Sequence, residues 1–187
     1  MADVDEILMG AEEKMEKAIA SLNENFASVR TGRANAMILD RIVVDYYGSP
    51  TPINQMAGIK APDAHMLVIE PWDKSVLKDI EQAILNSNLG VTPNNDGSVI
   101  RLPFPSLTEE RRRDLAKQCK TYAEECRVAI RNARRGANEA VEKAQKNDGL
   151  PEDEAHRAED QVQKITDKYI AKVDELLKKK EDDIMEV

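Results

Sequence analysis

The amino-acid sequence predicts an α+β protein: an elongated antiparallel three-helix bundle with a small β/α domain inserted into it. Three long segments repeat apolar residues at steps of three and four, which is the pattern of helices that pack along one face. Between the first and second of these segments the pattern changes to runs of β-branched and aromatic residues, which favour strands. Only 4% of the 187 residues are aromatic, a composition typical of extended helical packing.

The first helix is predicted over residues 3–29. Its apolar residues form a coiled-coil-like stripe that consists of Val4, Leu8, Ala11, Met15, Ala18, Leu22, Phe26 and Val29. Acidic residues crowd its first turns, where the helix dipole favours negative charge. The helix is expected to end near Arg30-Thr31-Gly32-Arg33, with Gly32 just after the last helical residue, because glycine adopts the left-handed conformation required there.

Residues 31–105 are predicted to form the inserted β/α domain. Short strands are expected at residues 41–47, 53–60, 66–69, 91–92 and 98–102, of which the second is ambiguous. Gly48 to Pro52 is expected to be a turn that closes the first strand. Asp73 is the expected N-cap of a helix that ends at 88–90. The sequence Asn94-Asn95-Asp96-Gly97 predicts a hairpin turn.

The second long helix is predicted from Leu107 to Lys146, with Thr108 or Ser106 as its N-cap. At about 1.5 Å per residue it is a rod on the order of 60 Å long. On a helical wheel its apolar face consists of Cys119, Tyr122, Ala123, Cys126, Ala129, Ile130, Ala133, Ala137, Ala140, Val141 and Ala144. A basic stripe flanks that face and consists of Arg113, Lys117, Lys120, Arg127, Arg131, Arg134 and Arg135. Residues 147–151 break the helix, and a third helix follows at about 152–185.

The order of these segments predicts two domains. Residues 1–30 and 106–187 are expected to form the three-helix bundle, because three helices with matching apolar stripes can bury them only against one another. Residues 31–105 are expected to form the inserted domain. The chain crosses between the two domains twice, at 30–34 and 103–106, so we expect a two-strand hinge that bends more readily than it twists.

The net charge of -8 is unevenly distributed along the chain. Residues 106–151 carry 11 basic and 8 acidic side chains, whereas both ends of the chain are acidic. An acidic protein with one basic strip avoids indiscriminate binding to polyanions but keeps a directed site. Cys119 and Cys126 lie too far apart along one helix for a disulfide and indicate a reducing compartment. No signal peptide or membrane span is recognised, so we expect a cytoplasmic protein.

No catalytic or metal-binding constellation is found in the sequence. His65 and His156 are isolated, without cysteine or carboxylate residues at the spacing of a metal site or a catalytic triad. The segment Thr31-Gly32-Arg33-Ala34 lacks the glycine spacing and the lysine of a phosphate-binding loop. We therefore expect no catalytic residues, no metal site and no cofactor.

The arginines at 127–135 have two interpretations. In the first, they form a solvated helix face whose charges pair with acidic residues on the other two helices. In the second, they bind RNA phosphates, because this stretch contains four arginines and no acidic residue, and the planar guanidinium group suits phosphate oxygens. Glu124 and Glu142 lie near the same sector and count against the second interpretation. We favour RNA binding, by a predicted site of Arg113, Lys120, Arg127, Arg131, Arg134 and Arg135.

Four segments resemble the bacterial ribosome recycling factor family, in the same order and over the whole chain. These segments are Arg30–Ala34, Ile42–Pro52, Leu107–Arg112 and Arg127–Asn138. The resemblance implies an L-shaped, tRNA-like outline with the three-helix bundle as the long arm. It also implies a factor that acts with elongation factor G and GTP to split the post-termination ribosome, the GTP being hydrolysed by that partner. We expect this chain to be a monomer.

The resemblance also implies roles for particular residues. Arg131, Arg134 and Arg135 match arginines that contact ribosomal RNA of the large subunit, and Arg127 lies one turn earlier on that face. Two hinge segments are implied, namely Arg30-Thr31-Gly32-Arg33 and Pro103-Phe104-Pro105. At Gly136 some family members carry an acidic residue, and its loss leaves the strip more positive. The alternative function that stays open is a helical structural or chaperone-like module, which binds protein and uses the basic strip only for solubility.

Overall fold

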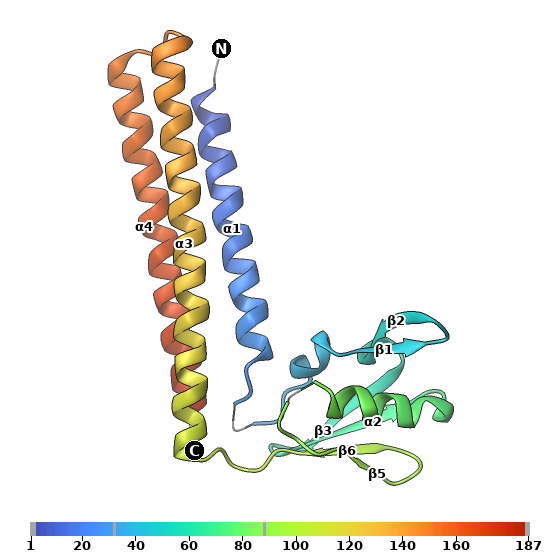
Figure 1. Cartoon of the computed structure of the whole chain (residues 1–187). Helices are drawn as coiled ribbons and strands as arrows, with labels where there is room; N and C mark the ends of the chain where they lie inside the picture. Colours follow the sequence, from blue (N-terminus) through green and yellow to red (C-terminus); the bar gives the residue numbers. More distant parts are fainter. Residues whose placement is uncertain (1–2, 32, 88, 186–187) are drawn as a thin grey trace. The chain divides into compact units, whose positions relative to one another are not determined.

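The computed structural model describes residues 3–31, 33–87 and 89–185. Three long helices and a small sheet contain most of these residues, as Figure 1 shows. The helices are α1 (Val4–Ser28), α3 (Glu109–Asn147) and α4 (Glu152–Met185). They confirm the three predicted helical segments and the α+β class. Gly32, predicted to follow the first helix, lies outside the described residues.

The chain divides into two compact units. The first unit joins the segment up to Phe26 with Lys117–Glu181, and it contains most of the three long helices. The second unit is Ala27–Ala116 together with the end of α4. This division falls a few residues inside the helices. The domain limits at residues 30 and 106 stay a prediction.

In the first unit, the apolar stripes of the three helices are buried against one another. The buried residues are Ala11, Met15, Ile19, Leu22 and Phe26 on α1, Cys119, Ala123, Cys126, Ile130, Ala133, Ala137, Val141 and Ala144 on α3, and Ala155, Ala158, Val162, Tyr169 and Val173 on α4. Small residues on α3 allow close approach, since Cys126 Sγ lies 3.4 Å from the carbonyl oxygen of Ala18. Ala129, which was predicted to lie on the apolar face of α3, is exposed, so that part of the prediction is wrong.

Local hydrogen bonds explain where α3 begins and ends. The N–H of Arg111 donates to Thr108 Oγ1 at 3.1 Å, which confirms Thr108 as the N-cap. At the other end, the N–H of Leu150 donates to the carbonyl oxygen of Ala144 at 3.1 Å, and Gly149 adopts a φ of 74°. A left-handed glycine at this position ends a helix and turns the chain, so that α4 runs back beside α3 (Figure 1).

The second unit contains a four-stranded antiparallel sheet, a two-stranded hairpin and a short helix. The sheet has the strand order β3-β4-β6-β5, with β3 at Ala57–Asp63, β4 at Met66–Pro71, β5 at Asn94–Asn95 and β6 at Ile100–Pro103. The hairpin pairs β1 (Val43–Tyr46) with β2 (Ser49–Pro52), and the helix is α2 (Leu77–Leu85). One core joins these elements, and Leu67, Ile69, Ile80, Ile100 and Leu102 in it are fully buried.

One prediction about turns in this unit is wrong, and a second is confirmed with different limits. Residues 48–52 were expected to be a turn, but Ser49–Pro52 forms β2, where proline is tolerated because an edge strand need not use every N–H. The hairpin predicted at residues 94–97 is confirmed, since β5 pairs with β6, but Asn94–Asn95 belongs to the strand and not to the turn. The turn itself lies at Asp96, whose Oδ1 accepts hydrogen bonds from the N–H groups of Ser98 and Val99, and at Gly97, whose φ is 93°.

Short helical turns account for two other differences. Residues 53–60 were expected to form one strand, but a 3-10 helix at Ile53–Gln55 precedes β3. Another 3-10 helix, Ala36–Arg41, was not predicted; its cap is Asn35, which accepts a hydrogen bond from Met37. Asp73 accepts a hydrogen bond from the N–H of Ser75 at 3.0 Å, but it caps a 3-10 helix at Lys74–Val76 that leads into α2, whose own N-cap position is Val76. No strand is found at 91–92, within the described residues.

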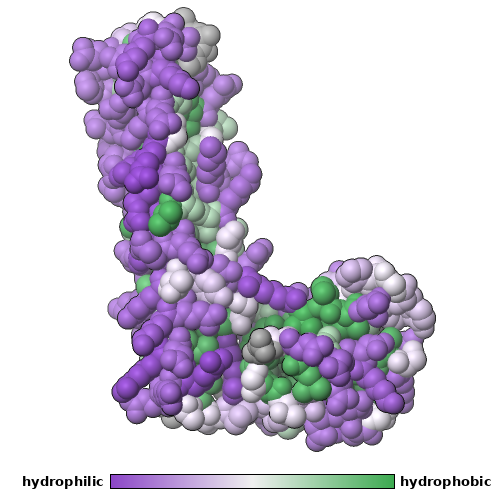
Figure 2. Space-filling model, in the orientation of Figure 1, coloured by the Kyte–Doolittle hydropathy of each residue, from purple (hydrophilic) through white to green (hydrophobic). Residues whose placement is uncertain are grey.

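The surface of the long helices is mostly hydrophilic. Figure 2 shows hydrophilic residues over most of the visible face of the long helices, with apolar atoms in narrow strips between them. Larger exposed apolar side chains occur in the second unit, among them Tyr47 and Trp72. None of the helices over the described ranges has an apolar stretch long enough to cross a membrane.

Candidate nucleic-acid interface

The basic residues of α3 lie beside its buried stripe. Ile130 and Ala133 are buried in the bundle, which fixes the rotation of the helix and so the direction of the arginines. The exposure of the four arginines differs: Arg127, Arg131 and Arg134 are half-buried, and Arg135 is exposed. What each guanidinium can bind therefore depends on the acidic residues next to it.

Arg127 is paired with carboxylates on two helices. Its Nε and Nη2 donate to Asp174 Oδ1 of α4 at 3.2 and 2.6 Å, and its Nη1 donates to Glu124 Oε2 at 3.3 Å. The hydrogen bonds to Asp174, followed by those to Glu124, raise the pKa of Arg127 although partial burial opposes this. Only 22% of the Arg127 side chain is exposed. Arg127 therefore joins α3 to α4 and offers little free surface to an RNA.

Arg131 is paired within α3. Its Nη2 donates to Glu124 Oε1 at 2.6 Å, and its side chain is 37% exposed. The hydrogen bonds from Arg131 and Arg127 lower the pKa of Glu124, so this carboxylate stays charged at neutral pH. The lack of acidic residues at 127–135 thus did not leave these two arginines unpaired. For two of the four arginines at 127–135, which we call the arginine strip, the interpretation as paired surface charge holds.

Arg134 and Arg135 have no hydrogen bond or ion pair to the rest of the described chain. The same holds for the exposed Lys120 one turn before Glu124. Arg113 donates to Glu109 at 2.6 Å, but both side chains are more than 70% exposed. Such a pair contributes only about 0.3–0.5 kcal/mol, so Arg113 can exchange Glu109 for a stronger anion.

Two arginines at the start of α3 were missed by the sequence analysis. Arg112 is half-buried and its Nε has no hydrogen-bond partner. Arg111 lies close enough to Arg30 to lower the pKa of Arg30, after the larger effect of burial. The sequence contains three successive arginines at 111–113, but only Arg113 lies in the basic stripe on the helical wheel. Because successive helix residues differ in direction by about 100°, the triplet spreads positive charge around this end of α3.

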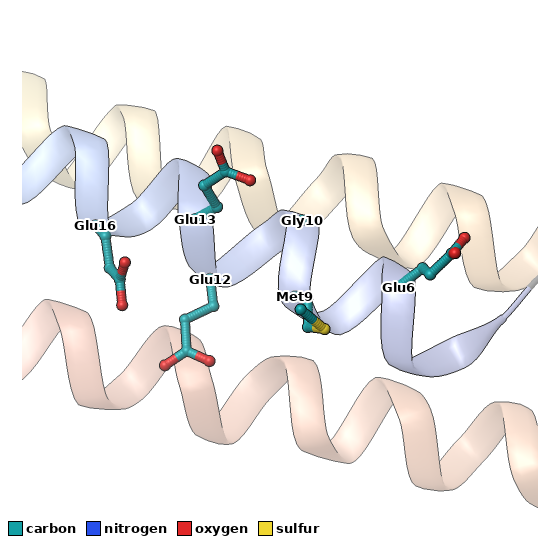
Figure 3. A pocket seen from close by; sticks show the side chains of 6 residues that line it. All are labelled: Glu6, Met9, Gly10, Glu12, Glu13 and Glu16. Atoms are coloured by element: carbon teal, nitrogen blue, oxygen red, sulfur yellow. The ribbon is translucent and has the colours of Figure 1, made fainter.

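A face of α1 carries the opposite charge. Glu6, Glu12, Glu13 and Glu16 line a pocket with Met9 and Gly10 (Figure 3). Figure 3 shows Glu12 and Glu16 directed toward α4, where Tyr169 Oη lies 3.1 Å from a carboxylate oxygen of each and its single hydrogen is shared between them. Burial raises the pKa of Tyr169, and these two carboxylates raise it further. The carboxylates gathered on this face repel a polyanion.

The predicted hinge residues differ in how firmly they are held. Thr31 Oγ1 accepts from the N–H of Arg33 at 3.4 Å, and Gly32 lies outside the described residues. Pro103 ends β6, and Phe104 is only 1% exposed within the core of the second unit. Arg30 donates to the carbonyl oxygen of Pro105. The segment at 103–105 is thus partly anchored in the sheet, which its sequence did not indicate.

Comparisons with known proteins place the chain among translation factors. The family model for ribosome recycling factor matches residues 22–185. A ribosome-recycling factor from Geobacillus thermodenitrificans is 56% identical over 182 residues, which are 97% of this chain and 98% of the relative. Another, from Desulforamulus reducens, is 53% identical over 184 residues, which are 98% of this chain and 100% of the relative.

Solved structures agree with these relatives. A solution structure of a ribosome recycling factor has 40% sequence identity and a TM-score of 0.82, and covers 100% of both chains. The T. thermophilus ribosome recycling factor, in models with E. coli elongation factor G bound to the E. coli post-termination complex, has 46% identity and a TM-score of 0.69 over 99% of this chain and 100% of that one.

The fold and these matches define a translation factor that acts on the ribosome. The matches cover nearly the whole of this chain and nearly the whole of the relatives. The chain belongs to the ribosome recycling factor family. The resemblance found in the sequence is confirmed.

Proposed function

We propose that this chain disassembles the post-termination ribosomal complex into subunits together with elongation factor G and GTP, and so releases ribosomes from mRNA for another round of translation. The observation that supports this most is the full-length match to recycling factors in sequence and fold. In the models that contain the similar T. thermophilus factor, this factor and elongation factor G are both bound to the post-termination complex. In this proposal the partner hydrolyses GTP and the chain itself is not an enzyme, since it lacks a phosphate-binding loop.

We further propose that α3 binds ribosomal RNA of the large subunit, with Arg134 and Arg135 as the main contacts. A convex helix cannot enter the deep, narrow major groove of A-form RNA, but a row of guanidinium groups can bind its phosphates. Lys120 and Arg113 extend the contact on exposed surface. Arg131 contributes by exchanging Glu124 for a phosphate, and Arg127 mainly holds the rod in shape.

The domain limits remain as proposed from the sequence: a bundle of residues 1–30 and 106–187, and an inserted domain of 31–105 on a two-strand hinge. The core of the second unit supports this, because every buried residue in it falls between Ile38 and Phe104. The inserted domain therefore has its own core and can move as a body. The GTPase pushes this domain, and the stiff bundle passes the force to RNA contacts between the subunits. The factor works as a monomer in the cytoplasm.

Subunit splitting in a purified system tests the proposed function. Post-termination ribosomes are mixed with this chain, elongation factor G and GTP, and the fall in light scattering is followed. We expect splitting only when all three are present. Intact ribosomes in the complete mixture would contradict the proposal. A chaperone-like module, in contrast, predicts no salt-dependent cosedimentation with large subunits.

A further inference from the structure

Two connecting segments link the core of the second unit to the long helices: residues 29–34 and residues 103–108. Arg30 lies on the first connecting segment, and its Nη2 donates a hydrogen bond to the carbonyl oxygen of Pro105 on the second, 75 residues further along the chain. Arg30 Cζ also lies 5.6 Å from the centroid of the Phe104 ring, which is a cation–π contact. One guanidinium group therefore joins the two connecting segments.

Both connecting segments are also fixed to the same turn of the sheet. The N–H of Ala34 donates to the carbonyl oxygen of Ala64 at 2.7 Å, and the N–H of Phe104 donates to that of His65 at 2.6 Å. Ala64 and His65 form the turn between β3 and β4. These anchors hold the segments at one edge of the core. Bending is therefore confined to residues before Ala34 and after Phe104, which is the region that Arg30 spans.

The contact made by Arg30 is a marginal one. Its Nε is buried without a hydrogen-bond partner. Burial lowers the pKa of Arg30, and the nearby charge of Arg111 lowers it further. An unpaired buried donor and a like charge both disfavour this arrangement. Arg127 is the opposite case, because two carboxylates offset its burial. The Arg30 contact is thus suited to open and close.

We propose that Arg30 is a positioning residue that clasps the two connecting segments and limits how far the inserted domain swings. With the clasp closed, Phe104 and Pro105 cannot move away from the first connecting segment. With the clasp open, the two segments separate and the domain samples a wider range of orientations. This inference rests on the hinge of the proposed function, to which it adds the contact that restrains the hinge.

Pulsed electron paramagnetic resonance on the full-length chain tests the clasp. Spin labels are placed at Lys143→Cys on α3 and Lys78→Cys on α2, both exposed positions. The native Cys119 and Cys126 are buried, and burial raises the pKa of both thiols to about 11, so they react slowly at neutral pH. We expect Arg30→Met to broaden the distance distribution about twofold in width. A width equal to that of the wild type would overturn the proposal.

Further variants separate the clasp from a general loss of structure. Arg157→Met removes an exposed arginine of α4 and should leave the width unchanged. Arg30→Lys keeps one charged donor but not the planar fork, so an intermediate width is expected. Arg111→Met removes the like charge that repels Arg30 and should not broaden the distribution; broadening in this variant contradicts the clasp. If Arg30→Met fails to fold, as judged by thermal melting, a folded Arg30→Lys of wild-type width overturns the proposal instead.

A binding measurement distinguishes this inference from the proposed function. Arg30→Met should bind large subunits with the same salt dependence as the wild type, because Arg30 is not among the α3 residues proposed to contact RNA. A loss of subunit splitting at unchanged binding then belongs to the clasp. Failure of the proposed function, in contrast, appears in the wild-type protein itself.

Discussion

The two halves of the arginine strip on α3 differ in what surrounds them. Arg127 and Arg131 are bound by Asp174 and Glu124, whereas neither of the next two arginines has an ion pair in the part of the chain that the structure describes. Identical side chains within three turns of one helix therefore have different surroundings. We propose that the first half stiffens the rod and that the second half binds phosphate. A run of one residue type is not a uniform binding surface.

The largest effect is expected from removing the unpaired half. Arg134→Ala with Arg135→Ala should weaken binding to large ribosomal subunits roughly a hundredfold, because two charge-assisted contacts are lost. The slope of the logarithm of the binding constant against the logarithm of the salt concentration should become shallower by about 1.5, because each lost phosphate contact removes roughly 0.7–0.9. Cosedimentation at several salt concentrations measures both quantities.

A matched double variant controls for net charge. Arg157→Ala with Lys164→Ala removes two exposed cations from α4 and should leave binding within about twofold. Both double variants should melt at the wild-type temperature. If the control weakens binding as much as the α3 variant does, the loss reflects net charge, and the unpaired half of the strip is not a specific binding site.

Variants of the paired half should lose more stability and less ribosome binding than the variant of the unpaired half. Arg127→Ala breaks the contact between α3 and α4, so the free energy of unfolding should fall by about 1 kcal/mol and the melting temperature by about 2–4 °C. Ribosome binding should change less than in the variant of the unpaired half. Thermal melting and cosedimentation give the two values, with Asp174→Asn as the matching change on α4. Unchanged melting in both variants would refute the stiffening role.

Gly136 lies directly after the unpaired half and permits a smaller change. A methyl group added at Gly136 would meet no atom within 4 Å, and the residue lies inside α3. Gly136→Ala should therefore raise the free energy of unfolding by about 0.5–1 kcal/mol. Gly149→Ala is the control of opposite sign, because Gly149 has a φ of 74° that alanine adopts poorly. Denaturant titration of both variants checks the contrast.

The smallest effect concerns the carboxylate that both paired arginines share. The pKa of Glu124 is lowered below its ordinary 4.5 by hydrogen bonds from Arg131 and Arg127. A carboxyl group with a lowered folded-state pKa stabilises the fold above its unfolded pKa and loses this contribution as the pH falls through the folded value. Glu124→Gln should thus melt slightly below the wild type near neutral pH and converge with it in acid.

The same variant also bears on RNA binding. Glu124→Gln releases Arg131 from its charged partner, so binding to large subunits should become slightly tighter. Weaker binding would mean that Glu124 orients Arg131 toward the RNA and does not compete with it. Melting curves at several pH values and cosedimentation at neutral pH provide the two measurements.

Most of the fold followed from interactions between residues close in sequence. The steps of three and four, the Thr108 cap and the glycine turn at Gly149 depend on neighbours within about one helical turn, so the sequence alone determined the three helices. The family resemblance came from the same local segments. The hairpin of β1 and β2 was missed because strand pairing competes with turn propensity, and only the packed sheet decides between them.

The state of each arginine depended on contacts that the sequence does not encode locally. Asp174 stands 47 residues after Arg127, and only the rotation of α4 against α3 brings the two together. The anchoring of Phe104 in the core likewise requires the whole sheet. The sequence by itself determined that this protein is a helical rod with a basic strip and an inserted β/α unit. The tertiary structure decided which charges of the strip are free, because pairing across helices is set by how their buried stripes pack.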